Sequence, residues 1–84
     1  MGKALAIYRI YPEENQDLKQ MIDELAKIPE VKGVQREPIA FGLEVIKVGV
    51  VVDDKTGNPQ EVEDKLRTIK GVKELDCLEV SLIS

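Results

Sequence analysis

Two stretches of the sequence alternate apolar side chains with a period of two residues. The first covers residues 3–11, and the second covers residues 43–53. A period of two places every second side chain on the same face of an extended strand. Because apolar residues fall on both faces of each stretch, we predict that both are central strands of a sheet. The recurring apolar positions are Ala4, Ala6, Tyr8 and Ile10 in the first stretch and Ile46, Val48, Val50 and Val52 in the second.

A helical repeat follows the first strand, and we predict a helix from about Asn15 to Ile28. Glu13 and Glu14 place negative charge before it, which suits the positive end of the helix dipole. Pro29 ends the repeat, because proline cannot continue the helical hydrogen bonding. The apolar stripe of this helix is Leu18, Met21, Ile22, Leu25 and Ile28.

A second helix has a well-marked start. Asn58 fits the N-cap, Pro59 the first helical position and Glu61 the third. Gly71 is the expected left-handed residue after its end. The predicted buried face is Val62, Leu66 and Ile69. The outer face carries two pairs at four-residue spacing, Glu61 with Lys65 and Glu63 with Arg67.

Two further strands complete the set. A weaker strand covers residues 31–37, and Pro38 restricts its end to an edge or a turn. The last strand covers residues 72–83. Its apolar phase changes at the adjacent residues Cys77 and Leu78, which predicts a β-bulge or a kink there. We expect Cys77 to be a small buried apolar side chain rather than a reactive thiol.

The order strand, helix, strand, strand, helix, strand predicts the fold. A weak internal repeat supports it, because "IPEVKGV" at residues 28–34 and "IKGVKEL" at residues 69–75 each lead from a helix into a strand. Two βαβ halves with right-handed crossovers give an α+β, ferredoxin-like βαββαβ sandwich. We predict a four-stranded antiparallel sheet in the order 4-1-3-2 with both helices on one face, in a single domain of residues 1–84.

Composition removes most kinds of chemistry. The 84 residues include no histidine and one cysteine, so the commonest general base and metal ligand is missing and no thiolate cluster can form. We therefore expect no metal and no cofactor, and we interpret the adjacent Asp53 and Asp54 as a solvated turn rather than an acid–base pair. The net charge of -4 disfavours direct nucleic-acid binding. No apolar run is long enough to span a membrane, and we expect a cytoplasmic protein with no membrane partner.

One connection stands out, the stretch "EPIAFGLE" at residues 37–44. It holds Phe41, the single phenylalanine of the chain, between Pro38 and Gly42, where a turn is expected. In one interpretation Pro38 and Gly42 shape the turn, while Ile39 or Phe41 covers the open end of the core. In the other it is an exposed apolar anchor for a protein partner, since aromatic residues are enriched at interfaces and loops commonly carry function.

The whole chain resembles the archaeal translation elongation factor 1-beta family. The matching residues are "PIAFGL" at residues 38–43, "VVVDDKTG" at residues 50–57, and "YPEE" after the opening strand. The resemblance implies a guanine nucleotide exchange factor that promotes GDP release and GTP reloading of elongation factor 1-alpha, a GTPase, without bond-making chemistry of its own. The partner-binding residues that it implies are Pro38, Ile39, Ala40, Phe41, Gly42, Leu43, Asp53, Asp54 and Lys55.

The end of the chain departs from the pattern of the eukaryotic relatives. Those proteins have a lysine near the C-terminus that reaches the magnesium site of the GTPase, whereas this chain ends "EVSLIS", with Ser81 and Leu82 in that region. We therefore expect exchange to depend on contacts of the 38–43 loop. The alternative function is a small-metabolite-binding regulatory domain of the same fold, which would use a dimer interface at the sheet edge.

Overall fold

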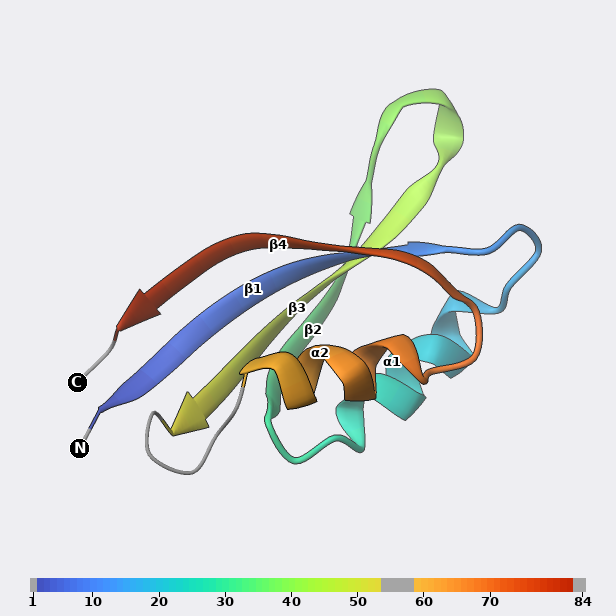
Figure 1. The fold of residues 1–84 in the computed structure, drawn as a ribbon. Helices are drawn as coiled ribbons and strands as arrows, with labels where there is room; N and C mark the ends of the chain where they lie inside the picture. Colours follow the sequence, from blue (N-terminus) through green and yellow to red (C-terminus); the bar gives the residue numbers. More distant parts are fainter. Residues whose placement is uncertain (1, 54–58, 83–84) are drawn as a thin grey trace.

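The chain folds as one antiparallel sheet with two helices packed on the same side of it (Figure 1). The computed structural model describes residues 2–53 and 59–82. The sheet order β2-β3-β1-β4 is the predicted order read from the other edge, and the ferredoxin-like fold is confirmed. The elements are β1 (Lys3–Pro12), α1 (Leu18–Ala26), β2 (Val31–Pro38), the 3-10 turn η1 (Ala40–Gly42), β3 (Glu44–Asp53), α2 (Pro59–Arg67) and β4 (Val72–Leu82).

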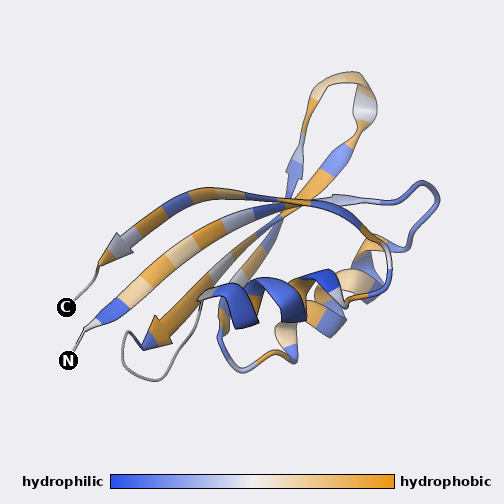
Figure 2. Ribbon diagram, viewed as in Figure 1, coloured by the Kyte–Doolittle hydropathy of each residue, from blue (hydrophilic) through white to orange (hydrophobic). Residues whose placement is uncertain are grey.

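The core lies between the sheet and the helices. The alternation in β1 and β3 turns one set of side chains from each strand toward the helices, and both strands are central as predicted. The helices contribute Met21 and Leu25 from α1 and Val62 and Leu66 from α2 to this core. Hydrophobic residues follow the strands and the inner sides of the helices (Figure 2). The strand residues of this core are Ala4, Ala6, Tyr8, Ile10, Ile46, Val48, Val50 and Val52.

The start of α1 differs from the prediction. Asn15 has a φ of 63°, in the left-handed region, so it cannot be a helical residue. The helix begins at Leu18, because the side chain of Asp17 accepts hydrogen bonds from the backbone N–H groups of Lys19 (3.0 Å) and Gln20 (3.3 Å). The Asp17 cap, and not the acidic pair Glu13 and Glu14, therefore sets the start of the helix. At the other end the N–H of Ile28 donates to the carbonyl of Leu25, so the predicted last residue lies in a tightened final turn.

The second helix begins at Pro59 as predicted. The proposed cap, Asn58, lies outside the described residues. One predicted pair is present, with Arg67 Nη2 3.6 Å from Glu63 Oε1. The other is wrong.

Lys65 does not pair with Glu61, because it reaches a residue that is remote in sequence. Its Nζ lies 2.9 Å from Oε2 of Glu30, in the connection between α1 and β2. This hydrogen bond holds the pKa of the Glu30 carboxyl below its ordinary value. Periodicity within one helix could not reveal this tertiary contact. After α2, Gly71 has a φ of 97°, which confirms the left-handed position.

The predicted bulge in β4 is confirmed. Ile7 of β1 faces Glu79 and Tyr8 faces Cys77, so Leu78 is the extra residue. A second shift, which no pattern in the sequence indicates, leaves Lys73 without an opposite residue. The expectation for Cys77 was wrong: the thiol is exposed, because β4 is an edge strand.

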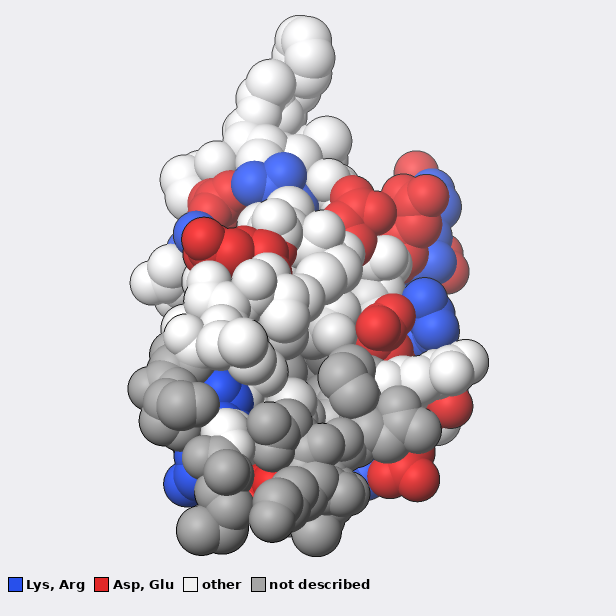
Figure 3. All heavy atoms as spheres, turned by 60° about the vertical axis from the view of Figure 1, so that its left-hand side comes forward, with Lys and Arg blue, Asp and Glu red and all other residues white. Residues whose placement is uncertain are grey.

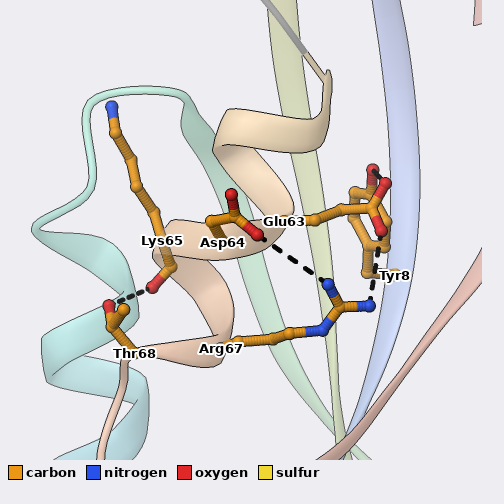
Figure 4. Close-up of polar contacts among 6 residues, drawn as sticks. All are labelled: Tyr8, Glu63, Asp64, Lys65, Arg67 and Thr68. Carbon is orange, nitrogen blue, oxygen red and sulfur yellow. Dashed lines mark hydrogen bonds and ion pairs between the residues drawn. The ribbon is translucent and has the colours of Figure 1, made fainter.

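Tyr8 is the buried aromatic residue of the core, with 1% of its surface exposed. Its hydroxyl donates a hydrogen bond to Oε2 of Glu63 on α2, at 3.4 Å (Figure 4). Arg67 lies beside Glu63 and is also 3.9 Å from Asp64. Burial, and then the negative charge of Glu63, raises the pKa of Tyr8 to about 12.

This shift predicts a loss of stability in alkali. In the unfolded chain Tyr8 ionises near pH 10, whereas in the folded chain it keeps its proton up to about pH 12. Between these values the unfolded state binds fewer protons, so the free energy of unfolding falls as the pH rises. Urea unfolding at pH 9 and pH 11.5 should show a larger loss for the wild type than for Tyr8→Phe. Equal losses would show that Tyr8 is not the group responsible, since the two proteins differ only in the hydroxyl group of this residue.

Candidate functional site

The connection between β2 and β3 is the tip of a hairpin that projects beyond the body of the sheet (Figure 1). The two strands pair as far as Pro38 and Glu44. Between them the N–H of Ile39 donates to the carbonyl of Leu43 at 2.8 Å, which closes the loop. We call residues 38–43 the hairpin tip.

Phe41 points away from the protein at this tip. Its exposed fraction is 97%, so it does not cover the core, and that interpretation is wrong for Phe41. Its backbone has a φ of 66° and a ψ of 28°, and the next residue, Gly42, has a φ of 74°. A left-handed conformation is ordinary for glycine but costs other residues about 1–2 kcal/mol. Such strained positions in folded proteins are concentrated at functional sites.

The surface of the hairpin tip is uncharged and partly apolar. Besides Phe41, Ile39 is 37% exposed and Leu43 is 60% exposed. In the space-filling view of Figure 3 the tip is a projection without acidic or basic side chains. An exposed group of apolar side chains that the domain does not bury is typical of a surface that binds another molecule. The tip can therefore contact a partner, but it has no group that could transfer a proton or bind a metal.

Charged pairs support the hairpin at its base. Arg9 Nη2 on β1 lies 2.9 Å from Oε1 of Glu37 on β2, and Lys47 Nζ on β3 lies 4.0 Å from the other oxygen of that carboxylate. Arg36 Nε lies 2.9 Å from Oε2 of Glu44. These cross-strand contacts hold the base in place. The partly apolar hairpin tip is thus followed by a base that carries ion pairs between strands.

Comparison with known protein families shows the family of this chain. The family model of the EF-1 guanine nucleotide exchange domain matches residues 5–83. The chain belongs to this family. Members of this family act on a GTPase without themselves making or breaking a covalent bond. The role of the family is nucleotide exchange in translation elongation.

Individual relatives of the exchange family agree over nearly the whole chain. The elongation factor 1-beta of Methanoculleus marisnigri is 40% identical over 99% of this chain and 100% of its own length. That of Methanoregula boonei is 37% identical, with coverage of 98% and 99%. A solved structure titled "Crystal structure of PH0061" aligns with a TM-score of 0.65 and 27% identity. It matches 99% of this chain, which spans 53% of that longer chain.

The residues that the resemblance implies for this family do not form one patch. Asp53 is the last residue of β3 and pairs in register with Lys3, whereas the hairpin tip precedes the first residue of β3. With about 3.3 Å per residue, the two ends of β3 are about 30 Å apart. Leu82 lies opposite Ala4, so the end of β4 is on the Asp53 side. Asp54 and Lys55 are outside the described residues.

Other kinds of site are not found in the described part of this exchange-family chain. Within residues 2–53 and 59–82, no group of three or more His, Cys, Asp or Glu side chains could hold a metal ion. Neither described helix is long and apolar enough to cross a membrane. The hairpin tip is therefore the candidate site that the described geometry favours.

Proposed function

We propose that this chain, acting as a single exchange domain, promotes GDP release from elongation factor 1-alpha so that GTP can rebind. The observation that carries this proposal is the fully exposed Phe41 at the tip of a hairpin in a chain of the exchange family. The family match favours this function over the regulatory metabolite-binding alternative.

The mechanism that we propose is thermodynamic linkage. A partner that binds the nucleotide-free GTPase more tightly than the GDP-bound form must weaken GDP binding by the same factor. A GTPase holds its nucleotide through backbone amides, a lysine and a magnesium ion at the phosphates. Movement of any of these by a docked partner lowers nucleotide affinity. Such a partner needs shape and apolar contact rather than an acid, a base or a metal.

The hairpin tip suits this task. In our proposal Phe41 is the anchor that enters the nucleotide-binding domain of the GTPase, and Ile39 and Leu43 bury apolar area around it. Pro38, Ala40 and Gly42 set the path of the backbone. Because the tip is closed by the 2.8 Å backbone hydrogen bond from Ile39, less conformational entropy is lost when it binds.

The residues Asp53, Asp54 and Lys55 would form a second, separate contact. The molecule is 42 Å long, and Asp53 and the hairpin tip lie at opposite ends of β3. A GTPase that contacts both sets must therefore lie along the length of the sheet. With no lysine in "EVSLIS", we assign the larger share of the exchange effect to the hairpin tip.

The test is the rate of GDP release from the cognate elongation factor 1-alpha loaded with a fluorescent GDP. Micromolar wild-type chain with excess GTP should accelerate release, and the rate should saturate with increasing concentration of the chain. The matched control is the same GTPase with an unrelated acidic protein of similar size. An unchanged release rate would rule the proposed function out.

A further inference from the structure

A groove lies beside the hairpin tip and gives that surface a second wall. Its volume is about 640 Å³, and it runs between the tip and the connection from β1 to α1. Both segments lie at the end of the molecule away from the two termini (Figure 1). The connection is hydrophilic, whereas the tip is partly hydrophobic (Figure 2). The apolar lining includes Leu18, Ile39, Leu43 and Val45.

The rim of this groove is acidic. Glu13 and Glu14 line it from the β1–α1 connection and Glu74 from β4, with Lys73 as the basic lining residue. Over the described parts of the chain, no ion pair is formed by the carboxylates of Glu13, Glu14 or Glu74. Their charge is therefore not neutralised within the protein. A groove with an apolar floor and acidic edges attracts cationic ligands and repels anionic ones.

The backbone holds both walls in place. On one side the N–H of Glu13 donates to the carbonyl of Gly71 at 2.7 Å, which joins the β1–α1 connection to the turn between α2 and β4. Next to it, Asn15 is left-handed, as Phe41 is across the groove. Within the described residues these are the two non-glycine positions with positive φ. The groove is thus built by two defined turns, not by a gap between long side chains.

We infer that this groove receives a segment of the translation GTPase in which an apolar side chain is flanked by lysine or arginine. The inference rests on the proposed function and extends it, because Ile39 and Leu43 belong both to the hairpin tip and to the groove. A partner that binds Phe41 would therefore lie next to this groove. The apolar side chain of the segment would lie on the floor while its cations face Glu13, Glu14 and Glu74.

Other occupants do not fit this charge pattern. A nucleic acid or a free nucleotide would bring phosphates toward the acidic rim. A second copy of the chain carries a net charge of -4 and would be repelled as well. A cationic, partly apolar protein segment satisfies both parts of the surface.

The first experiment compares two charge reversals of equal size. Glu13→Lys/Glu14→Lys changes the rim, and Asp23→Lys/Glu61→Lys changes two exposed helical positions outside the groove. Association with nucleotide-free elongation factor 1-alpha is followed by stopped flow at low and high salt. We expect the rim variant to associate roughly tenfold more slowly at low salt and to lose most of the salt dependence, while the control behaves as the wild type.

The outcomes separate this inference from the proposed function. If the wild type accelerates GDP release but the rim variant and the control associate alike, the groove inference is wrong and the proposed function stands. If the wild type does not accelerate release, the proposed function fails.

The second experiment identifies the occupant directly. A photo-crosslinking amino acid at Gln16, which lines the groove, should label a GTPase segment that contains an apolar residue next to Lys or Arg. Labelling of an acidic segment or of a second copy of the chain would overturn the inference.

Discussion

Phe41→Ala will slow nucleotide exchange by about 30-fold or more, the size expected for a central interface anchor worth about 2 kcal/mol. The stability of the domain should hardly change, because 97% of the phenylalanine surface is already exposed to solvent. Substitutions at such positions alter the free energy of unfolding by about 0.5 kcal/mol or less. The measurement is fluorescent GDP release together with urea unfolding of the same samples. Loss of folding in the variant would contradict the exposed position of Phe41.

Two further variants show which property of Phe41 matters. Phe41→Gly also removes the side chain, but glycine adopts a φ of 66° without strain, so this variant should be as slow in exchange and somewhat more stable. Leu78→Ala removes a 42% exposed apolar side chain on β4 and serves as the matched control. It should exchange at the wild-type rate. Full activity of Phe41→Gly would show that the phenyl ring is not the anchor.

Leu25→Ala should have the largest effect on stability. Leu25 is completely buried in the core, and alanine is a good helix former, so the change removes packing and leaves the propensity of α1 intact. Loss of a buried leucine costs about 2–5 kcal/mol. At about 0.05–0.15 kcal/mol per residue, a domain of this size has only about 4–13 kcal/mol in total.

The consequence is a domain close to unfolding. The midpoint of urea unfolding should fall sharply for Leu25→Ala, with an unchanged slope. Asp23→Ala places the same residue type on the exposed side of the same helix and should shift the free energy of unfolding by about 0.5 kcal/mol or less. Similar stabilities for both variants would contradict the burial of Leu25. Exchange activity per folded molecule should be normal in each.

The fold could be predicted because its signals are periodic and local. Alternation in β1 and β3 fixed both the strands and their buried faces, and adjacent Cys77 and Leu78 indicated the bulge. The start of α1 was misplaced, because the acidic pair Glu13 and Glu14 suggested a start near Asn15, whereas the side chain of Asp17 caps the helix. Contacts between remote segments have no periodic signal at all. The pairing of Lys65 with Glu30 is of this kind.

The candidate site was only half visible in the sequence. Pro38 and Gly42 indicated a turn, and the phenylalanine between them suggested either a cover for the core or an anchor. The structure shows Phe41 exposed and with a left-handed φ, and no residue-type rule predicts that angle for phenylalanine. The acidic rim of the groove was also missed. Glu13 and Glu14 read as helix-start charges, while Glu74 is remote in sequence and meets them only through the fold.

The two irregularities of β4 have a consequence for crowded solutions. In the described sheet β4 has β1 as its sole neighbour, so its other side offers open backbone groups to any extended chain. The extra residues Lys73 and Leu78 break the even spacing that a new strand would have to match. Edge-to-edge stacking of copies into filaments is thereby opposed. The irregular edge thus disfavours self-association of the sheet at high protein concentration.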